Sequence, residues 1–339
     1  MSAIQEARQL WTLVNEDEES RQEMVLATLV AVEGSAYRRP GAKMIMRADG
    51  RMQGTLSGGC LEGDLFQHAE RVMRTHEPCV QHYDLTEDDM WGLGIGCKGR
   101  VDIWLEPLVL KDDFWRIFDA CIHRDAPIIW GAELPKGRRF LFSEAFSCGA
   151  VPAWAGMLAS SGNRADAGFR EGFWWDVMKP PSRLVIAGAG HDAEPVARLA
   201  NQVGFQVMIM DPRRLVNNDH HFPHTSHCLT PPSEIDANTV QGAYWVIMNH
   251  HQRRDEEALA LAARSRPQFV GVLGPLTRTL EMLTNMNVMS QDLPLHMPVG
   301  LDVGGETPEE VAVSIVGELM AWRKGVSGGS LHGREHVHS

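Results

Sequence analysis

The chain has 339 residues, 44% of them hydrophobic, and a formal net charge of −12 at pH 7. The apolar fraction is ordinary for a globular protein, and the length predicts two or three domains of roughly 100–200 residues each. The acidic excess argues against a nucleic-acid partner, because phosphate binding needs a basic surface. No run of about 18 apolar residues is present, so we expect no membrane span.

The six cysteines are scattered, and the closest two, Cys79 and Cys97, lie 18 positions apart. This spacing excludes a C-x-x-C zinc site and the clustered cysteines of iron–sulfur proteins. The chain is long and starts without a secretory signal pattern, so a disulfide framework is not expected. We therefore expect a protein of a reducing compartment, the cytoplasm.

The first region, residues 1–110, alternates short strands with helices. The patterns predict an amphipathic helix over 1–20, strands over 24–32, 43–47 and 101–105, a hairpin turn at Asp49-Gly50, and a helix over 61–74. Residues 111–180 are less regular and are expected to connect two domains, with a helix at 114–121, strands at 127–130 and 139–142, and a loop at 160–168. Lys179-Pro180-Pro181-Ser182 has the composition of a linker.

Strands and helices then alternate through residues 181–325, which is typical of a parallel sheet covered by helices. The expected strands are 183–187, 206–210, 244–248 and 269–273, and the expected helices are 193–203, 255–263 and a last one opened by Thr307-Pro308-Glu309-Glu310 as a capping box. Residues 326–339 are rich in Gly, Ser and His and are expected to form a flexible tail. The fold class is therefore α/β, with an N-terminal α/β domain followed by a Rossmann-like domain.

A G-x-G-x-x-A motif, Gly188 to Ala193, joins the first strand of that second domain to a helix. Gly188 permits the tight turn and Gly190 lets a diphosphate approach the backbone, with His191 beside it. Asp211 closes the next strand, where an acid would accept ribose hydroxyls. The motif predicts a site for NAD(P) or another nucleotide; a Rossmann-like domain with an empty site is the alternative.

Two glycine-rich loops in the first region each end in a cysteine. The first holds Ser57, Gly58, Gly59 and Cys60 just before a predicted helix, a setting that favours anion binding and a reactive thiolate.

The second loop holds Gly94, Gly96, Cys97 and Lys98, and the lysine would lower the pKa of the thiol. Inert buried cysteines and tight structural turns are the alternatives for these loops.

Further candidates are the cations of Arg38 and Arg39, which could contact phosphate or carboxylate, although exposed arginines are commoner. His250 and His251 follow a predicted strand at its carboxyl end, where open α/β sheets bind ligands, although histidines of polar loops are often simply exposed.

Several of these motifs, in order, resemble the family of xanthine dehydrogenase accessory proteins of the XdhC/CoxI type. The matching segments are 34–42, 54–62, 92–99, 106–108, 188–191, 211–213, 271–274, 298–304 and 307–315. The resemblance implies a cytoplasmic maturation factor for molybdenum hydroxylases such as xanthine dehydrogenase, an enzyme of purine catabolism. Members are taken to bind the molybdenum cofactor, a molybdopterin or its dinucleotide form, to help a cysteine desulfurase install its terminal sulfur, and to pass it to the apoenzyme.

By position, the resemblance places Cys60 and Cys97 nearest the metal or the sulfur, and Gly188, Gly190 and Asp211 at the nucleotide site. It implies a chaperone more than a catalyst, although some members are named as dehydrogenase subunits, and a homodimer is one expected assembly. Lys98 and the Asn249-His250-His251 segment depart from the family pattern.

Two other functions stay open from the sequence. The first is a nicotinamide-dependent oxidoreductase with His191, His250 or His251 as its acid or base. The second is a nucleotide-sensing component of a larger complex.

Overall fold

The computed structural model describes residues 3–16, 23–34, 36–59, 61–85, 99–109, 111–124, 126–160 and 166–333. Within these ranges the chain forms two compact units, one ending at Pro180 and the other running from Pro181 to His332.

The N-terminal unit contains a first, antiparallel sheet in the order β3-β2-β1-β5-β4. Its elements are α1 (Ala3–Glu16), β1 (Met24–Gly34), β2 (Lys43–Arg47), β3 (Met52–Gly54), α2 (Glu62–Thr75), β4 (Cys79–Asp84) and β5 (Gly99–Pro107). Helix α2 buries Leu65, Ala69 and Val72 against one face of this sheet. The predicted strands and the helix predicted over 61–74 are confirmed, the helix predicted over 1–20 is observed over 3–16, and β3 and β4 are additional.

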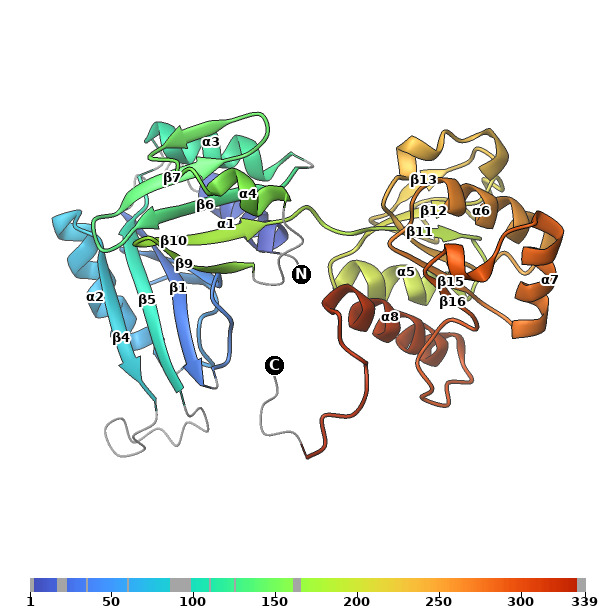
Figure 1. Ribbon diagram of the computed structural model, residues 1–339. Helices are drawn as coiled ribbons and strands as arrows, with labels where there is room; N and C mark the ends of the chain where they lie inside the picture. The colour runs from blue at the N-terminus through green and yellow to red at the C-terminus, as the bar shows by residue number, and fades with distance from the viewer. Residues whose placement is uncertain are drawn as a thin grey trace. The chain divides into compact units, whose positions relative to one another are not determined.

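Residues 113–178 form a second antiparallel sheet, in the order β8-β7-β6-β10-β9. Its elements are α3 (Asp113–Ile122), β6 (Ile128–Glu133), β7 (Arg138–Phe142), β8 (Ser147–Gly149), α4 (Ala155–Ser160), β9 (Ala167–Arg170) and β10 (Phe173–Met178). One apolar core joins the two sheets, with Leu26 and Trp104 from the first and Trp130 and Trp174 from the second. Strand β10 lies between β6 and the edge strand β9 (Figure 1), yet its sequence, FWWDVM, did not show the alternation that identifies a strand.

Two ion pairs lie between the sheets of the N-terminal unit. Lys43 Nζ of β2 lies 2.5 Å from Asp176 Oδ2 of β10, and both side chains are almost completely buried. Arg139 Nε of β7 lies 2.5 Å from Glu106 Oε2 of β5. Burial is the largest influence on Glu106 and raises its pKa from 4.5 to about 7, although the Arg139 guanidinium opposes it.

The C-terminal unit is a six-stranded, fully parallel sheet in the order β13-β12-β11-β14-β15-β16. Its strands are β11 (Arg183–Ala187), β12 (Gln206–Met210), β13 (Ser226–Cys228), β14 (Tyr244–Ile247), β15 (Phe269–Val272) and β16 (Leu295–His296). Numbered from β11, this is the Rossmann order 3-2-1-4-5-6. The predicted Rossmann-like parallel sheet, and with it the α/β fold class, is confirmed.

Helices cover both faces of this sheet (Figure 1). They are α5 (Ala193–Gln202) and α8 (Pro308–Lys324) on one face, and α6 (Gln252–Arg264) and α7 (Leu276–Met286) on the other. Short 3-10 helices, η2 (Pro232–Glu234), η3 (Ala237–Val240) and η4 (Ser290–Asp292), lie in the connections. The predicted capping box opens α8, with Thr307 accepting from the Glu310 amide and Glu310 accepting from the Thr307 amide.

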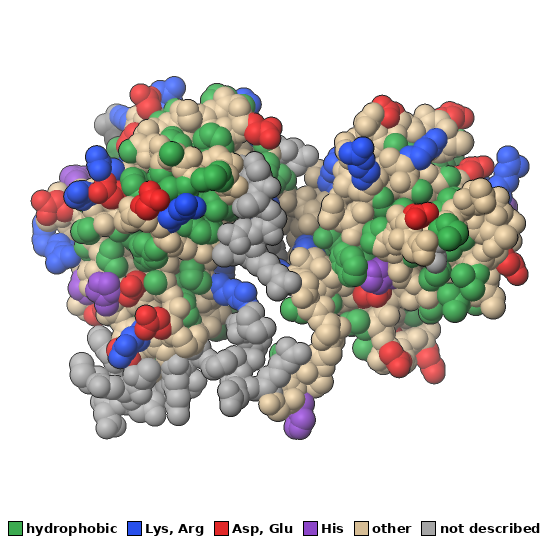
Figure 2. Space-filling view, in the orientation of Figure 1, with side chains coloured by type: hydrophobic (Ala, Val, Ile, Leu, Met, Phe, Trp, Pro, Cys, Tyr) green, Lys and Arg blue, Asp and Glu red, His purple; other side chains and the backbone are tan. Residues whose placement is uncertain are grey.

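The surface of each unit mixes charge and apolar groups. On the faces visible in Figure 2, acidic and basic side chains are interspersed among hydrophobic ones. None of the helices described is both long enough and apolar enough to cross a bilayer.

Candidate functional site

The carboxyl edge of the parallel sheet contains the place where ligands bind in open α/β folds. The strand order reverses between β11 and β14, so the loops after these two strands lead away from each other to opposite faces. The loop after β11 contains Gly188 and Gly190, and the loop after β14 contains Asn249 and His250. We call this place the switch point.

Gly188 and Gly190 meet different neighbours there. Gly188 has a φ of +120°, and a Cβ atom at this residue would lie only 2.7 Å from the Met248 carbonyl oxygen. Only glycine therefore lets the two loops pack together. At Gly190 a Cβ atom would lie 2.5 Å from Asp192 Oδ1, so the space above this glycine is occupied by a carboxylate of the same loop.

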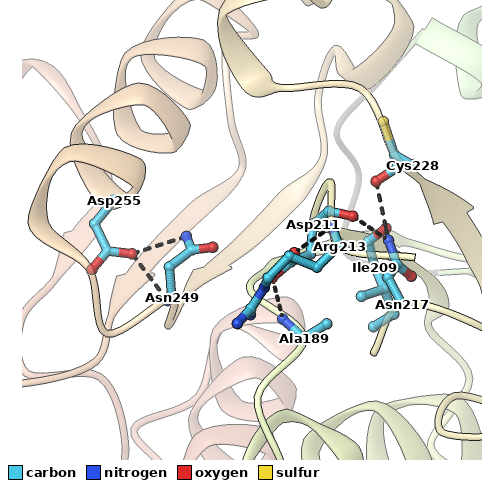
Figure 3. Close-up of polar contacts among 8 residues, drawn as sticks. All are labelled: Ala189, Ile209, Asp211, Arg213, Asn217, Cys228, Asn249 and Asp255. Atoms are coloured by element: carbon cyan, nitrogen blue, oxygen red, sulfur yellow. Dashed lines mark hydrogen bonds and ion pairs between the residues drawn. The ribbon is translucent and has the colours of Figure 1, made fainter. Parts of the chain in front are cut away.

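Asp211, the acid expected to bind ribose, is completely buried and bonded within the protein (Figure 3). Its Oδ1 accepts from the amide and Nε of Arg213, each at 2.9 Å. Its Oδ2 accepts from the Ala189 amide at 3.1 Å and from Arg213 Nη2 at 2.6 Å. Burial alone would raise the pKa of Asp211, but the bonds from Arg213 and the two amides outweigh it, and the pKa is lowered.

Asn217 holds the ends of β12 and β13 together beside Asp211 (Figure 3). Its buried amide nitrogen lies within hydrogen-bond distance of three carbonyl oxygens, those of Ile209, Asp211 and Cys228. Its Oδ1 lies 2.7 Å from His227 Nδ1. The hydrogen bonds of Asn217 to these carbonyl oxygens therefore fix the loop after β12 against the ends of β12 and β13.

A second carboxylate network fixes the loop after β14. The buried Asp255 of α6 accepts from the amide and side chain of Asn249, each at 3.0 Å (Figure 3). Its other oxygen pairs with Arg278, which reaches back from α7. Buried carboxylates thus support the switch point from both sides.

The histidines predicted for this site lie in two different environments. His191 is almost fully exposed, and its Nδ1 lies 3.3 Å from Glu194 Oε1, which also contacts His221 Nδ1 at 3.0 Å. His250 Nε2 lies 2.7 Å from Asp192 Oδ2, so His250 joins the loop after β14 to the loop after β11. His251 is exposed at the start of α6.

The first glycine-rich loop of the N-terminal unit is fastened by the helix that follows it. Ser57 Oγ lies 2.5 Å from Glu62 Oε2, and the amides of Ser57 and Leu61 both donate to the Glu62 carboxylate at 3.1 Å. Part of the predicted anion site therefore holds an acid of the chain itself. Gly58 and Gly59 stay exposed, and a Cβ atom at either would meet nothing within 4 Å.

The two predicted arginines lie in different environments. Arg38 Nη2 lies 2.8 Å from both carboxylate oxygens of Glu6 in α1, so its charge is balanced within the unit. Arg39 is exposed beside it and is the arginine available to an external anion.

The predictions on Cys60, Cys97, Gly94 and Gly96 lie outside the described residues. Of the described cysteines, Cys121 is buried, and Cys79, Cys148 and Cys228 are partly buried free thiols. Within the described ranges, no group of three His, Cys, Asp or Glu side chains is placed to hold a metal ion.

Several residues of these networks were not predicted from sequence, among them Glu62, Asp192, Asp255 and Arg278. Glu62 is the first residue of a helix that follows a glycine loop, a position where an acid commonly turns back to bind loop amides, so local sequence contained that signal. Asp192 stands inside the glycine motif, but its partner His250 is 58 positions away, and Asp255 and Arg278 are 23 apart. Only the fold brings these residues together.

Comparison with protein families matches both units. The XdhC Rossmann domain matches residues 184–319, and the XdhC and CoxI family matches residues 18–84.

Relatives extend over nearly the whole chain. A Bacillus subtilis protein described as a probable xanthine dehydrogenase subunit is 30% identical over 91% of this chain and 96% of its own length. The Escherichia coli molybdenum cofactor insertion chaperone PaoD is 25% identical over 88% of this chain and 83% of its own. A Bacillus halodurans crystal structure described as a xanthine dehydrogenase superposes with a TM-score of 0.79 at 30% identity, covering 96% of this chain and 97% of that one. The chain belongs to the XdhC and CoxI family.

Proposed function

We propose that this protein is a maturation factor for a molybdenum hydroxylase of the xanthine dehydrogenase type. It binds molybdenum cofactor as cargo, assists its sulfuration and inserts it into the apoenzyme. The observation that carries the proposal is the extent of the similarity: both units match the family, and the similarity to an insertion chaperone covers 88% of the chain.

The cargo site in this proposal is on the glycine-rich loops of the N-terminal unit. Molybdopterin carries a phosphate and a soft dithiolene, so it needs backbone donors, a cation and sulfur-compatible ligands. Gly58 and Gly59 offer exposed backbone, and Arg39 offers an exposed guanidinium. Cys60 and Cys97 are the proposed ligands of the metal or its sulfur, and Gly94 and Gly96 are proposed cofactor-binding residues of the second loop.

The partners follow from the role. The client is a molybdenum hydroxylase apoenzyme such as xanthine dehydrogenase, which would place the protein in purine catabolism, and a cysteine desulfurase supplies the sulfur. Both steps belong in the reducing cytoplasm, where thiolates persist. A homodimer would let one protomer hold cargo while its partner contacts a client.

An NAD(P)-dependent oxidoreductase is the alternative reading of the Rossmann unit. The geometry gives it little support, because Asp211 is bonded internally on both oxygens and Asp192 lies over Gly190. We therefore do not assign a redox reaction to His191, His250 or His251.

An insertion assay tests the proposal. Apo-hydroxylase is incubated anaerobically with molybdenum cofactor and a sulfur-loaded cysteine desulfurase, with and without the protein, and the recovered hydroxylase activity is measured. We expect the protein to increase activation several-fold. Cys60→Ser and Cys97→Ser should lose this increase, and Cys148→Ser, a partly buried thiol of the second sheet, is the matched control. Equal activation with and without the protein would refute the proposed role.

A further inference from the structure

A histidine–carboxylate pair spans the switch point of the Rossmann unit. His250 Nε2 lies 2.7 Å from Asp192 Oδ2, and the two residues come from the loops after β14 and β11. The Asp192 side chain is 24% exposed and that of His250 is 59% exposed, so the pair lies at the surface of the sheet edge. A dinucleotide in a Rossmann fold would have to cross between these two loops.

The Asp192 side chain also occupies the space over Gly190, which a diphosphate would fill in a dinucleotide-binding motif. The second glycine of G-x-G lets a diphosphate approach the backbone at the start of the helix. Here the Asp192 carboxylate oxygen lies 2.5 Å from the position of a Cβ on Gly190. An incoming diphosphate would therefore meet both the volume and the negative charge of this side chain.

Capping of helix α5 does not explain the orientation of the Asp192 side chain. Aspartate at the position before a helix usually accepts from the amides of the first turn. Asp192 occupies that position before α5 but makes no such capping bond. Its described polar partner is instead His250, on the far side of the switch point.

Asp211, the acid expected to bind the ribose of a dinucleotide, is also bonded within the protein. A carboxylate has about four lone-pair positions, and the four bonds from Ala189 and Arg213 fill those of Asp211. No acceptor is left for ribose hydroxyls unless Arg213 moves.

We propose that Asp192, positioned by His250, is the specificity residue that excludes dinucleotide diphosphates from this Rossmann unit. The excluded ligands are those in which a negatively charged diphosphate links two nucleosides, and they include the nicotinamide dinucleotides. This inference concerns nucleotide selection in the C-terminal unit and does not depend on whether the N-terminal loops bind cofactor.

The test is a gain of binding, measured by titrating the full chain with NADH and following the fluorescence of the reduced nicotinamide. Asp192→Ala removes both charge and volume, Asp192→Asn removes the charge alone, and Glu281→Gln removes an exposed charge on α7 as the matched control. We expect weak binding to the wild type and to the control. Asp192→Ala should bind at least about tenfold more tightly, with Asp192→Asn between them.

His250→Asn separates the two residues of the pair. It leaves the Asp192 charge at the α5 terminus but frees this side chain from its partner, so NADH should bind more tightly than to the wild type and less tightly than to Asp192→Ala. Circular dichroism and thermal unfolding show whether each variant is folded. Tight binding by the wild type, or folded Asp192→Ala and Asp192→Asn proteins that gain no affinity, would overturn the proposal. Failure of cofactor insertion would leave this result unaffected.

Discussion

The two units place their buried charges in different parts of the fold. In the N-terminal unit the buried Lys43, Glu106 and Asp176 belong to strands; Lys43 pairs with Asp176 between the two sheets, and Glu106 pairs there with the partly buried Arg139. In the C-terminal unit the parallel sheet is apolar between its helices, and Asp211 and Asp255 lie just beyond strand ends. Ion pairs therefore link the two sheets in the first unit, whereas in the second unit buried carboxylates fix the loops at the carboxyl edge of the parallel sheet.

This contrast predicts which substitutions affect stability and which affect loop geometry. Removing one member of a buried pair leaves the other charge without compensation in a medium that solvates it poorly. Removing a polar group at the sheet edge exposes backbone that water can partly reach.

Lys43→Met should destabilise the N-terminal unit by about 3–5 kcal/mol, because it leaves the Asp176 carboxylate buried and unpaired. The double variant Lys43→Met/Asp176→Leu should recover most of this loss. Urea unfolding followed by tryptophan fluorescence measures both, since Trp130 donates to the same carboxylate at 3.2 Å. Lys179→Met, which breaks the exposed pair with Asp166, is the control and should change stability by less than about 1 kcal/mol. Equal effects of Lys43→Met and Lys179→Met would contradict the assigned role of the buried pair.

Glu106→Gln should change how stability depends on pH. The native pKa of about 7 exceeds the ordinary 4.5, so the folded state binds the extra proton between these values. Its contribution is therefore complete below about pH 4.5 and is lost as the pH rises through 7. The shift corresponds to about 3 kcal/mol. Unfolding measured from pH 4.5 to 8.5 should show a shallower decline in the variant; identical slopes would exclude Glu106 as the titrating group.

Asn217→Ala should destabilise the C-terminal unit by about 2 kcal/mol. The substitution leaves buried carbonyl oxygens at the ends of β12 and β13 without their shared donor. Asn238→Ala, at an exposed position in η3, should stay within about 0.5 kcal/mol of the wild type. Thermal unfolding and amide hydrogen exchange of residues 206–228 measure the effect. Unchanged exchange there would show that Asn217 does not hold the loop.

Thr307→Ala should cost about 1 kcal/mol, because it removes the side-chain acceptor of the capping box at α8. The effect should appear as faster hydrogen exchange in the first turn of this helix, with β11 and β14 unchanged. Thr307→Ser keeps the acceptor and should restore most of the protection. Loss of protection throughout the unit would show that the cap has more than a local role.

The same contrast explains how far the sequence predicted the structure. The Rossmann unit repeats a local pattern, an apolar strand followed by a helix, and its last helix opens with a capping box, so its first strands and last helix could be placed from sequence. The second sheet of the N-terminal unit depends on pairing between distant strands, and β10 carries the charged Asp176 at a core position. No local pattern shows that Lys43, 133 positions away, neutralises this charge.

The candidate site divides in a similar way. Gly188, Gly190 and Asp211 were identified because the Rossmann motif is local in sequence. That Asp211 is fully bonded, and that Asp192 fills the space over Gly190, depends on atomic positions in the folded chain. A motif thus located the edge of the sheet, whereas the side-chain geometry decides which ligands fit there.

The proposed role depends above all on molybdenum cofactor being carried by the N-terminal loops. The pterin content of the protein, measured as the fluorescent oxidation product after anaerobic loading and gel filtration, tests this directly. We expect pterin bound to the wild type and to Asp192→Ala, with little on Cys60→Ser or Cys97→Ser. Wild-type protein free of pterin, or loss of pterin on changing Asp192 but not the cysteines, would contradict the proposed role.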